Sequence, residues 1–180
     1  IMRELSKKNQ RAKFVNEITK EIYNDLANEI KKLLKGWNYP DLTSVTFDYD
    51  DQELIVSGKM RKNHGKGYRA ILNTAFLIAI MKYTRYNGLK HPGIIILDSP
   101  LTTYKEKTAA GNSIGSDEDI SLDMKQAFFN NLSDINQAHP DFQIIIFENI
   151  EPMSEVQDKM NYIHFTKTVG VGRYGFIPVD

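Results

Sequence analysis

Four aliphatic residues that run directly into an acidic residue constrain this chain more than any other feature. The run spans residues 94–97, and Asp98, Ser99 and Pro100 follow it. An apolar run of this length without alternation predicts a strand that is covered on both faces, as in the centre of a parallel sheet. Asp98 then stands at the carboxyl end of the strand, where open α/β sheets bind their ligands. The sequence therefore predicts an α/β fold with a mostly parallel sheet flanked by helices.

The bulk composition excludes several other classes of protein. The chain has 180 residues with 23 basic and 23 acidic side chains, so net charge indicates neither nucleic-acid nor membrane binding. It has no cysteine, which excludes a disulfide framework and a thiolate metal site and fits a cytoplasmic protein. The longest apolar run, residues 75–81, is too short to cross a bilayer. The first residue is Ile1 rather than Met, which leads us to expect a fragment of a longer protein.

Hydrophobic periodicity predicts the order of the remaining elements. They are a helix over residues 6–35 with Gly36 as its C-cap, a β-hairpin over 45–56, a buried helix over 68–86, a loop over 102–121, a helix over 122–138, a buried strand over 142–147, a short helix over 154–159, and a hairpin that turns at Gly170 and Gly172. The first helix has a narrow apolar stripe. It is either the end of a coiled coil or an ordinary amphipathic surface helix.

A basic, glycine-rich loop, residues 58–67, precedes the buried helix. The basic residues in and just after it are Lys59, Arg61, Lys62, Lys66 and Arg69. Glycines let backbone N–H groups approach a phosphate, and the following helix adds its N-terminal dipole. Phosphate binding is the functional interpretation, and a tight turn with solvated lysines is the structural one. The same basic side chains are candidates for salt-dependent contact with DNA phosphates.

A Walker A loop matches this segment only in part. The pattern G-x-x-x-x-G-K-[ST] finds its last glycine and its lysine at Gly65 and Lys66. It also requires a glycine at position 60 and a hydroxyl at position 67, where the sequence has Met60 and Gly67. The two mismatches disfavour a phosphate cradle of that type.

The order of glycine loop, buried helix, aliphatic strand, aspartate and proline turn resembles the C-terminal half of an ABC-type ATPase head. More narrowly, it resembles the SMC, RecN and SbcC-like ATPases, and among them bacterial SMC-like proteins with a Leu-Asp-Ser-Pro Walker B. The residues that carry the resemblance are 65–70, 94–101 and 172–176. It implies a P-loop NTPase head in which residues 1–36 end a coiled coil and residues 37–180 form the C-terminal ATPase lobe. The Walker A half would lie upstream, beyond a long coiled coil.

The resemblance also implies roles for individual residues. Asp98 corresponds to the Walker B aspartate that orients Mg²⁺, and Pro100-Leu101 begins the D-loop that contacts the opposite head. The signature loop, which presses on ATP held by a second head, corresponds to Asn63, His64, Gly65, Lys66 and Gly67. The implied cofactors are therefore ATP and Mg²⁺.

The chain departs from the family at the position after the Walker B aspartate. Most relatives have Glu there as the base that polarises the attacking water, and this chain has Ser99. Loss of a general base costs on the order of 10²–10⁴ in rate. Glu148, at the end of the second buried strand, is either a substitute base or a solvated acid. Glu148-Asn149 also stand where relatives carry a switch histidine, and neither His139 nor His164 is assigned to that role.

The expected function is ATP binding and hydrolysis at a composite head–head interface, in DNA repair, chromosome maintenance or defence against phage. The expected partners are the Walker A half of the same head, a second head and DNA. One alternative is a hydrolysis-deficient, ATP-gated clamp or interaction module. Another is a complete enzyme, such as a kinase or a toprim-type nuclease, with Asp98 and Glu148 as metal ligands. Tyr174 and Phe176 are expected to pack against the sheet.

Overall fold

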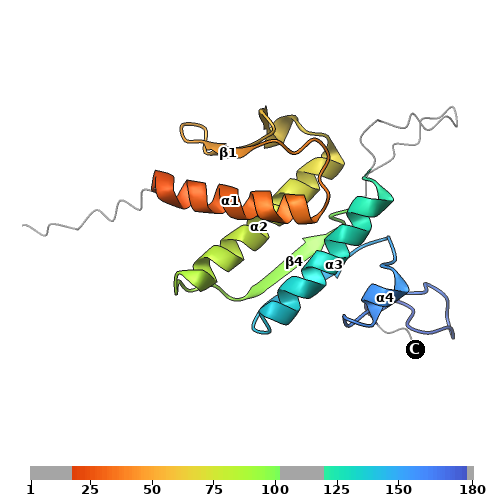
Figure 1. Ribbon diagram of the computed structural model, residues 1–180. Coiled ribbons are helices and arrows are strands. Elements are labelled where there is room, and N and C mark those ends of the chain that lie inside the picture. Colours follow the sequence, from red (N-terminus) through yellow and green to blue (C-terminus); the bar gives the residue numbers. More distant parts are fainter. Residues whose placement is uncertain (1–17, 102–119, 178–180) are drawn as a thin grey trace, which may run out of the picture.

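The computed structural model describes residues 18–101 and 120–177, which adopt a mixed α/β fold (Figure 1). The elements in these ranges are α1 (Lys20–Gly36), β1 (Val45–Asp48), β2 (Glu53–Val56), β3 (Lys59–Met60), the 3₁₀ turn η1 (Arg61–Asn63), α2 (Lys66–Tyr86), β4 (Ile94–Asp98), α3 (Leu122–Ala138), β5 (Gln143–Phe147) and α4 (Ser154–Gln157). None of the helices in these ranges is long and apolar enough to cross a membrane.

The first helix is shorter than its sequence pattern predicts. It begins at Lys20 after the N-cap Thr19, whose Oγ1 accepts a hydrogen bond from the Ile22 N–H at 3.4 Å. Gly36 is its last residue, and Trp37 takes the C-cap position in its place. The predicted part between residues 6 and 17, and with it most of the coiled-coil prediction, lies outside the described residues.

The core forms where α1 packs against α2, β1 and α3. The buried side chains of α1 are Tyr23, Leu26, Ala27, Ile30, Leu33 and Leu34, and those of α2 are Ile71, Leu72, Thr74, Ala75, Ile78, Ala79 and Met81. The prediction of an α2 buried nearly all round is wrong at Leu77, whose side chain is exposed. A helix with neighbours on only part of its circumference leaves such a position facing water.

The predicted β-hairpin is confirmed, with an additional strand. β1 and β2 pair antiparallel from Val45↔Val56 to Asp48↔Glu53. Their turn is held by the Asp48 Oδ1 atom, which accepts hydrogen bonds from the N–H groups of Asp50 and Asp51 at 3.0 Å each. β3 adds a third antiparallel strand. With two residues, it is too short to show a period in the sequence.

β4 and β5 form a parallel pair, as expected for the two buried-strand segments. Their register runs from Ile94↔Gln143 to Asp98↔Phe147, so both strands end together. Gly93 starts the pair in a left-handed conformation, φ +73°, and a Cβ there would stand 2.9 Å from the Asp141 carbonyl oxygen. Only glycine fits that backbone at that approach.

The prediction that the first of these strands is covered on both faces is wrong. The side chains of β4 alternate between exposed and buried, with Ile94 38% and Ile96 60% exposed, whereas Ile95 and Leu97 are buried. α2 contacts β4 and α3 contacts β5, so these helices cover one side of the pair. On the other side, the Phe176 ring approaches Phe147 and Ile145 is partly covered, while Ile94 and Ile96 stay exposed.

The C-terminal segment only partly matches its prediction. α4 is confirmed, but residues 162–177 form no strands and make a single bridge, between Phe165 and Arg173. The turn does fall at the predicted glycines, since Gly170 and Gly172 have φ of +78° and +56°. The Phe176 ring lies 6.2 Å from the ring of Phe147 at the end of β5, yet stays largely exposed. Most of the predicted loop over 102–121 lies outside the described residues.

Candidate functional site

Asp98 is the last residue of β4 and lies on the side of the parallel pair opposite the buried Ile95 and Leu97. Residues two apart on a strand share a face, so Asp98 lies on the same face as the exposed Ile94 and Ile96. Its side chain is exposed, and its Oδ1 atom accepts a hydrogen bond from the Ser99 Oγ at 3.0 Å. The structure therefore presents a carboxylate at the carboxyl end of the strand, next to an apolar surface.

The chain turns sharply after Asp98. Ser99 has φ +51°, a left-handed conformation that is unusual for a residue with a side chain. Its N–H continues the ladder between the strands by donating to the Phe147 carbonyl oxygen at 2.7 Å. Pro100 and Leu101 are buried in this chain's own core. Their side chains thus anchor the turn.

Glu148 joins this turn to the end of β5. Its Oε2 accepts a hydrogen bond from the Leu101 N–H at 2.8 Å, and its Oε1 accepts one from the Asn149 N–H at 2.8 Å. The side chain is half-buried. The sequence placed Glu148 at the neighbouring strand end, as observed. It did not reveal the bond to Leu101, which is 47 residues away.

The glycine loop lies toward the same end of the molecule as Asp98. A short link, residues 87–93, joins the end of α2 to the start of β4, and the two elements run in opposite directions against each other (Figure 1). By element length, α2 spans about 31 Å and β4 about 16 Å. The N-terminal end of α2 and the loop before it therefore extend beyond the end of β4.

The residues predicted to form a signature loop differ in their exposure to solvent. Gly65 is the N-cap of α2, and Lys66 begins the helix. Asn63 and Lys66 are exposed, whereas Gly67 is buried. The first turn of α2 contains no acidic residue, so no carboxylate within that turn offsets the partial positive charge of the helix N-terminus.

His64 turns its ring into the protein. Its Nε2 lies 3.2 Å from the Lys59 carbonyl oxygen, and its Nδ1 lies 3.2 Å from the Tyr39 hydroxyl. A carbonyl only accepts, so Nε2 donates, and in the neutral ring Nδ1 accepts from Tyr39. His64 thus ties the loop to the segment that follows α1. No local pattern in the sequence indicated Tyr39, which lies 25 residues away.

The backbone before α2 does not form a Walker A cradle. β3 belongs to the antiparallel sheet with β1 and β2 rather than to the parallel pair that carries Asp98. Between Lys59 and Gly67, all of them described residues, no backbone adopts the left-handed conformation that alternates in a phosphate-binding nest.

Arg61 makes structural contacts in place of an exposed basic site. Its Nε lies 3.1 Å from the Glu53 Oε1, and its terminal nitrogen donates to the Asn73 Oδ1 at 2.9 Å. It therefore links β2 to α2. Lys59 and Lys62 are exposed on the same loop.

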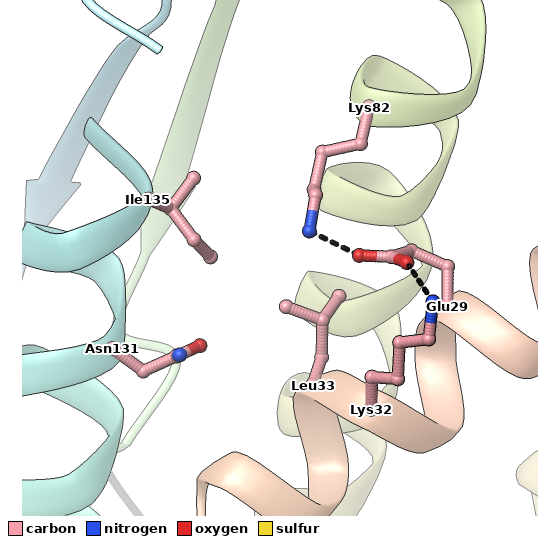
Figure 2. Close-up of a pocket in the computed structure, with 6 residues that line it drawn as sticks. All are labelled: Glu29, Lys32, Leu33, Lys82, Asn131 and Ile135. Carbon is pink, nitrogen blue, oxygen red and sulfur yellow. Dashed lines mark hydrogen bonds and ion pairs between the residues drawn. The ribbon is translucent and has the colours of Figure 1, made fainter. Parts of the chain in front are cut away.

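A hollow of about 190 Å³ lies between α1, α2 and α3 (Figure 2). Lys82 pairs with Glu29 there, and Lys32 lies 3.4 Å from the same carboxylate. Burial opposes ionisation of Glu29, but the two ammonium groups outweigh it and lower its pKa. Glu29 is thus already paired with the protein's own lysines and does not present a free carboxylate to a ligand.

A magnesium ion fits Asp98 only with help from other ligands. Mg²⁺ is held in nucleotide sites by one or two carboxylates together with phosphate oxygens and waters, and Asp98 supplies one exposed carboxylate. Among residues 18–101 and 120–177, no three acidic or histidine side chains gather as a metal group. The nuclease alternative, which relies on Asp98 and Glu148 alone, therefore gains no third ligand from these residues.

His164 is exposed and lies 3.2 Å from the Glu151 Oε1 by its Nδ1, in the segment after α4. Comparison with protein-family models and with curated proteins returns no match to this chain.

Proposed function

We propose that this protein is the C-terminal lobe of an SMC-like, ABC-type ATPase head, which binds and hydrolyses ATP with Mg²⁺ at a composite interface. The observation that carries the proposal is the position of Asp98. It stands at the carboxyl end of a parallel strand, on a face where its strand neighbours Ile94 and Ile96 are exposed. A nucleotide and a second lobe could approach the carboxylate from that side.

The exposed face of β4, at Ile94 and Ile96, supports the proposal that another lobe packs there. Exposed Ile94 and Ile96 form an apolar surface continuous with Asp98. Fully burying an exposed isoleucine contributes about 1.5–3 kcal/mol, and covering the exposed part of these two side chains would contribute a fraction of that each. The parallel pair also has only two strands in the described ranges, fewer than the usual 4–6 of a sheet. A Walker A half would add strands, cover this face and supply the phosphate cradle.

The division of labour follows from the side chains present. Bound magnesium would neutralise phosphate charge, and Asp98 would orient it through its water shell. The exposed N-terminal end of α2, with Asn63 and Lys66, would face the γ-phosphate of ATP held by a second head. The proposed location of the assembly is the cytoplasm.

Co-expression with the Walker A half tests the proposal. The reconstituted head should bind Mg-ATP, whereas this chain alone should bind it weakly or not at all. Asp98→Ala should abolish hydrolysis. Asp50→Ala, in the exposed β1–β2 turn, is the matched control and should leave turnover unchanged. Low-micromolar binding of Mg-ATP by this chain alone would contradict the proposal, because it would require a complete phosphate site here.

A hydrolysis-deficient clamp is the second candidate function. It is favoured by the absence of a carboxylate at position 99 and by the Ser99 hydroxyl, which is bonded to Asp98. An ATP-dependent dimer of heads without measurable turnover would favour the clamp. Measurable turnover that Asp98→Ala abolishes would favour the ATPase, including turnover slowed by the missing base.

DNA is proposed as a partner on the family resemblance. Exposed Lys59 and Lys62 on the glycine loop are the basic side chains that support it. Phosphate contacts release counterions, so replacing one lysine should reduce the slope of log affinity against log salt by about 1. Fluorescence anisotropy with labelled duplex DNA, from low to moderate salt, measures that slope.

A further inference from the structure

We infer that Glu148 is a positioning residue that holds the turn after Asp98, and that it does not activate water. The structural part of this inference rests on hydrogen bonds within the described chain. The catalytic part rests on the proposed ATPase function.

Glu148 extends the strand pairing past a point where the backbone cannot. The ladder between β4 and β5 ends with the Ser99 N–H, which donates to the Phe147 carbonyl oxygen. The next residue, Pro100, has no N–H to give. The following donor belongs to Leu101, and the Glu148 Oε2 accepts it at 2.8 Å. The Glu148 side chain thus provides the next hydrogen bond between the two segments, after the one that Pro100 cannot make.

Both sides of the left-handed Ser99 are therefore fixed to β5. A left-handed residue with a side chain costs about 1–2 kcal/mol and persists only where its surroundings hold it. The Ser99 N–H bond holds one side, and the Glu148–Leu101 bond holds the other. Asp98 precedes this turn directly, so the direction of its carboxylate depends on both bonds.

The same bonds argue against a role as base. Each carboxylate oxygen of Glu148 already accepts a backbone N–H, Oε2 from Leu101 and Oε1 from Asn149. A base gains and loses a proton in every cycle, and a proton on either oxygen would weaken the bond that oxygen accepts. The turn that carries Asp98 would then loosen at the moment of reaction. A carboxylate that stays ionised and accepts both N–H groups throughout the cycle fits this geometry better.

Two substitutions separate positioning from base catalysis. Glu148→Gln keeps one carbonyl oxygen that can accept from Leu101, and Glu148→Ala keeps none. Neither can take a proton from water. A positioning residue therefore predicts a graded series, whereas a base predicts that both variants fail equally.

The first measurement uses the chain alone and needs no nucleotide. Hydrogen exchange of the Leu101 amide, followed by NMR, should accelerate roughly 10- to 100-fold in Glu148→Ala and less in Glu148→Gln. The amides of Ile95 and Leu97, inside the strand pair, should stay protected and show that the fold persists. Glu151→Gln, which alters an exposed acid paired with His164, is the control. Unchanged exchange at Leu101 in Glu148→Ala would overturn the inference.

The second measurement uses the reconstituted head. Glu148→Gln should keep turnover within about tenfold of wild type, and Glu148→Ala should lose more and recover partly at high Mg²⁺. Equal losses on the order of 10²–10⁴ in both variants, without recovery by Mg²⁺, would overturn the inference and identify a base. A head that does not bind ATP at all would defeat the proposed function, while the exchange result at Leu101 would still decide the structural role of Glu148.

Discussion

Ser99 has a strained backbone and is also the position at which the chain departs from the SMC-like pattern. The resemblance to SMC-like heads implies a glutamate at this position, and the chain has a small hydroxyl in a left-handed conformation. The hydroxyl donates to Asp98 and so fixes the carboxylate locally. The backbone conformation rather than the hydroxyl sets which substitutions the position tolerates.

Position 99 should accept glycine and reject a β-branched residue. Ser99→Gly relieves the left-handed strain but makes the unfolded chain more flexible, so its net effect on the free energy of unfolding should stay within about 0.5 kcal/mol. Ser99→Val should lower that free energy by about 1–2 kcal/mol because its branched Cβ disfavours the conformation further. Urea denaturation of the two variants measures the difference. Equal stability of the two would show that the turn does not constrain φ.

Glu29 gives the chain an acid-sensitive contact between α1 and α2. Its folded-state pKa is lowered below the ordinary value of 4.5, because Lys82 and Lys32 outweigh the effect of burial. The pairing therefore stabilises the fold fully above about pH 4.5, and the contribution is lost as the pH falls through the lower folded-state pKa.

Glu29→Gln should remove that component of the pH dependence, worth about 1 kcal/mol for a half-buried pair. Urea denaturation of wild type and variant between pH 3 and pH 7, at a few values spaced by roughly one unit, gives the comparison. Identical slopes below pH 4.5 in both proteins would contradict the assignment.

The residues of the candidate site were predictable one by one, but their connections were not. A strand ending in Asp98 and a neighbouring strand ending before Glu148 follow from apolar runs, and the structure pairs these strands. The bond from Glu148 to Leu101 and the one from Tyr39 to His64 join distant segments. Periodicity reports which side of an element is buried and carries no information about such pairings.

At the scale of elements, long periodic segments were predictable and short ones were not. α3 spans 122–138 as expected because Ser121 caps it, accepting a hydrogen bond from the Met124 N–H at 3.1 Å. β3 and the segment 162–177 were not predicted correctly, since tertiary contacts rather than local pattern decide them. The exposed side of β4 was also missed, because an unbroken apolar run does not reveal which neighbours are present.

Trp37 should anchor α1 to α3. Its ring is fully buried against Phe128, with ring centres 4.9 Å apart, and its Nε1 donates to the Asn131 Oδ1 at 2.8 Å. Trp37→Phe leaves a cavity and removes the donor, so the free energy of unfolding should fall by about 1–3 kcal/mol.

Chemical denaturation measures the change, with Tyr86→Phe as the control. Tyr86 is exposed at the end of α2, so its effect should lie within about 0.5 kcal/mol. A Trp37→Phe variant as stable as this control would mean that the contact between α1 and α3 contributes little.

At the scale of the whole molecule, α2 and α3 cover one side of the parallel pair, and the other side stays exposed at Ile94 and Ile96, beside Asp98. Neighbouring residues of the same type thus stand in opposite environments, with Ile95 buried and Ile96 exposed. Comparing the two positions separates side chains that stabilise the chain alone from those that would contribute to the proposed assembly.

Ile95→Ala should destabilise the chain alone by about 2–4 kcal/mol, whereas Ile96→Ala should stay within about 0.5 kcal/mol. With the Walker A half present, Ile96→Ala should weaken association of the two halves by about tenfold, because one buried side chain is truncated there. Denaturation of the chain and titration calorimetry of the pair measure the two effects. Tight association unchanged by Ile96→Ala would exclude this face from the contact.

The outer edges of β4 and β5 are open to association with other strands. Within the described ranges, each strand has one edge with no neighbouring strand, next to the exposed apolar side chains of Ile94 and Ile96. Such edges recruit foreign strands and seed aggregates. We expect the chain, when expressed without the rest of the proposed head, to self-associate more readily as its concentration rises than the assembled head does.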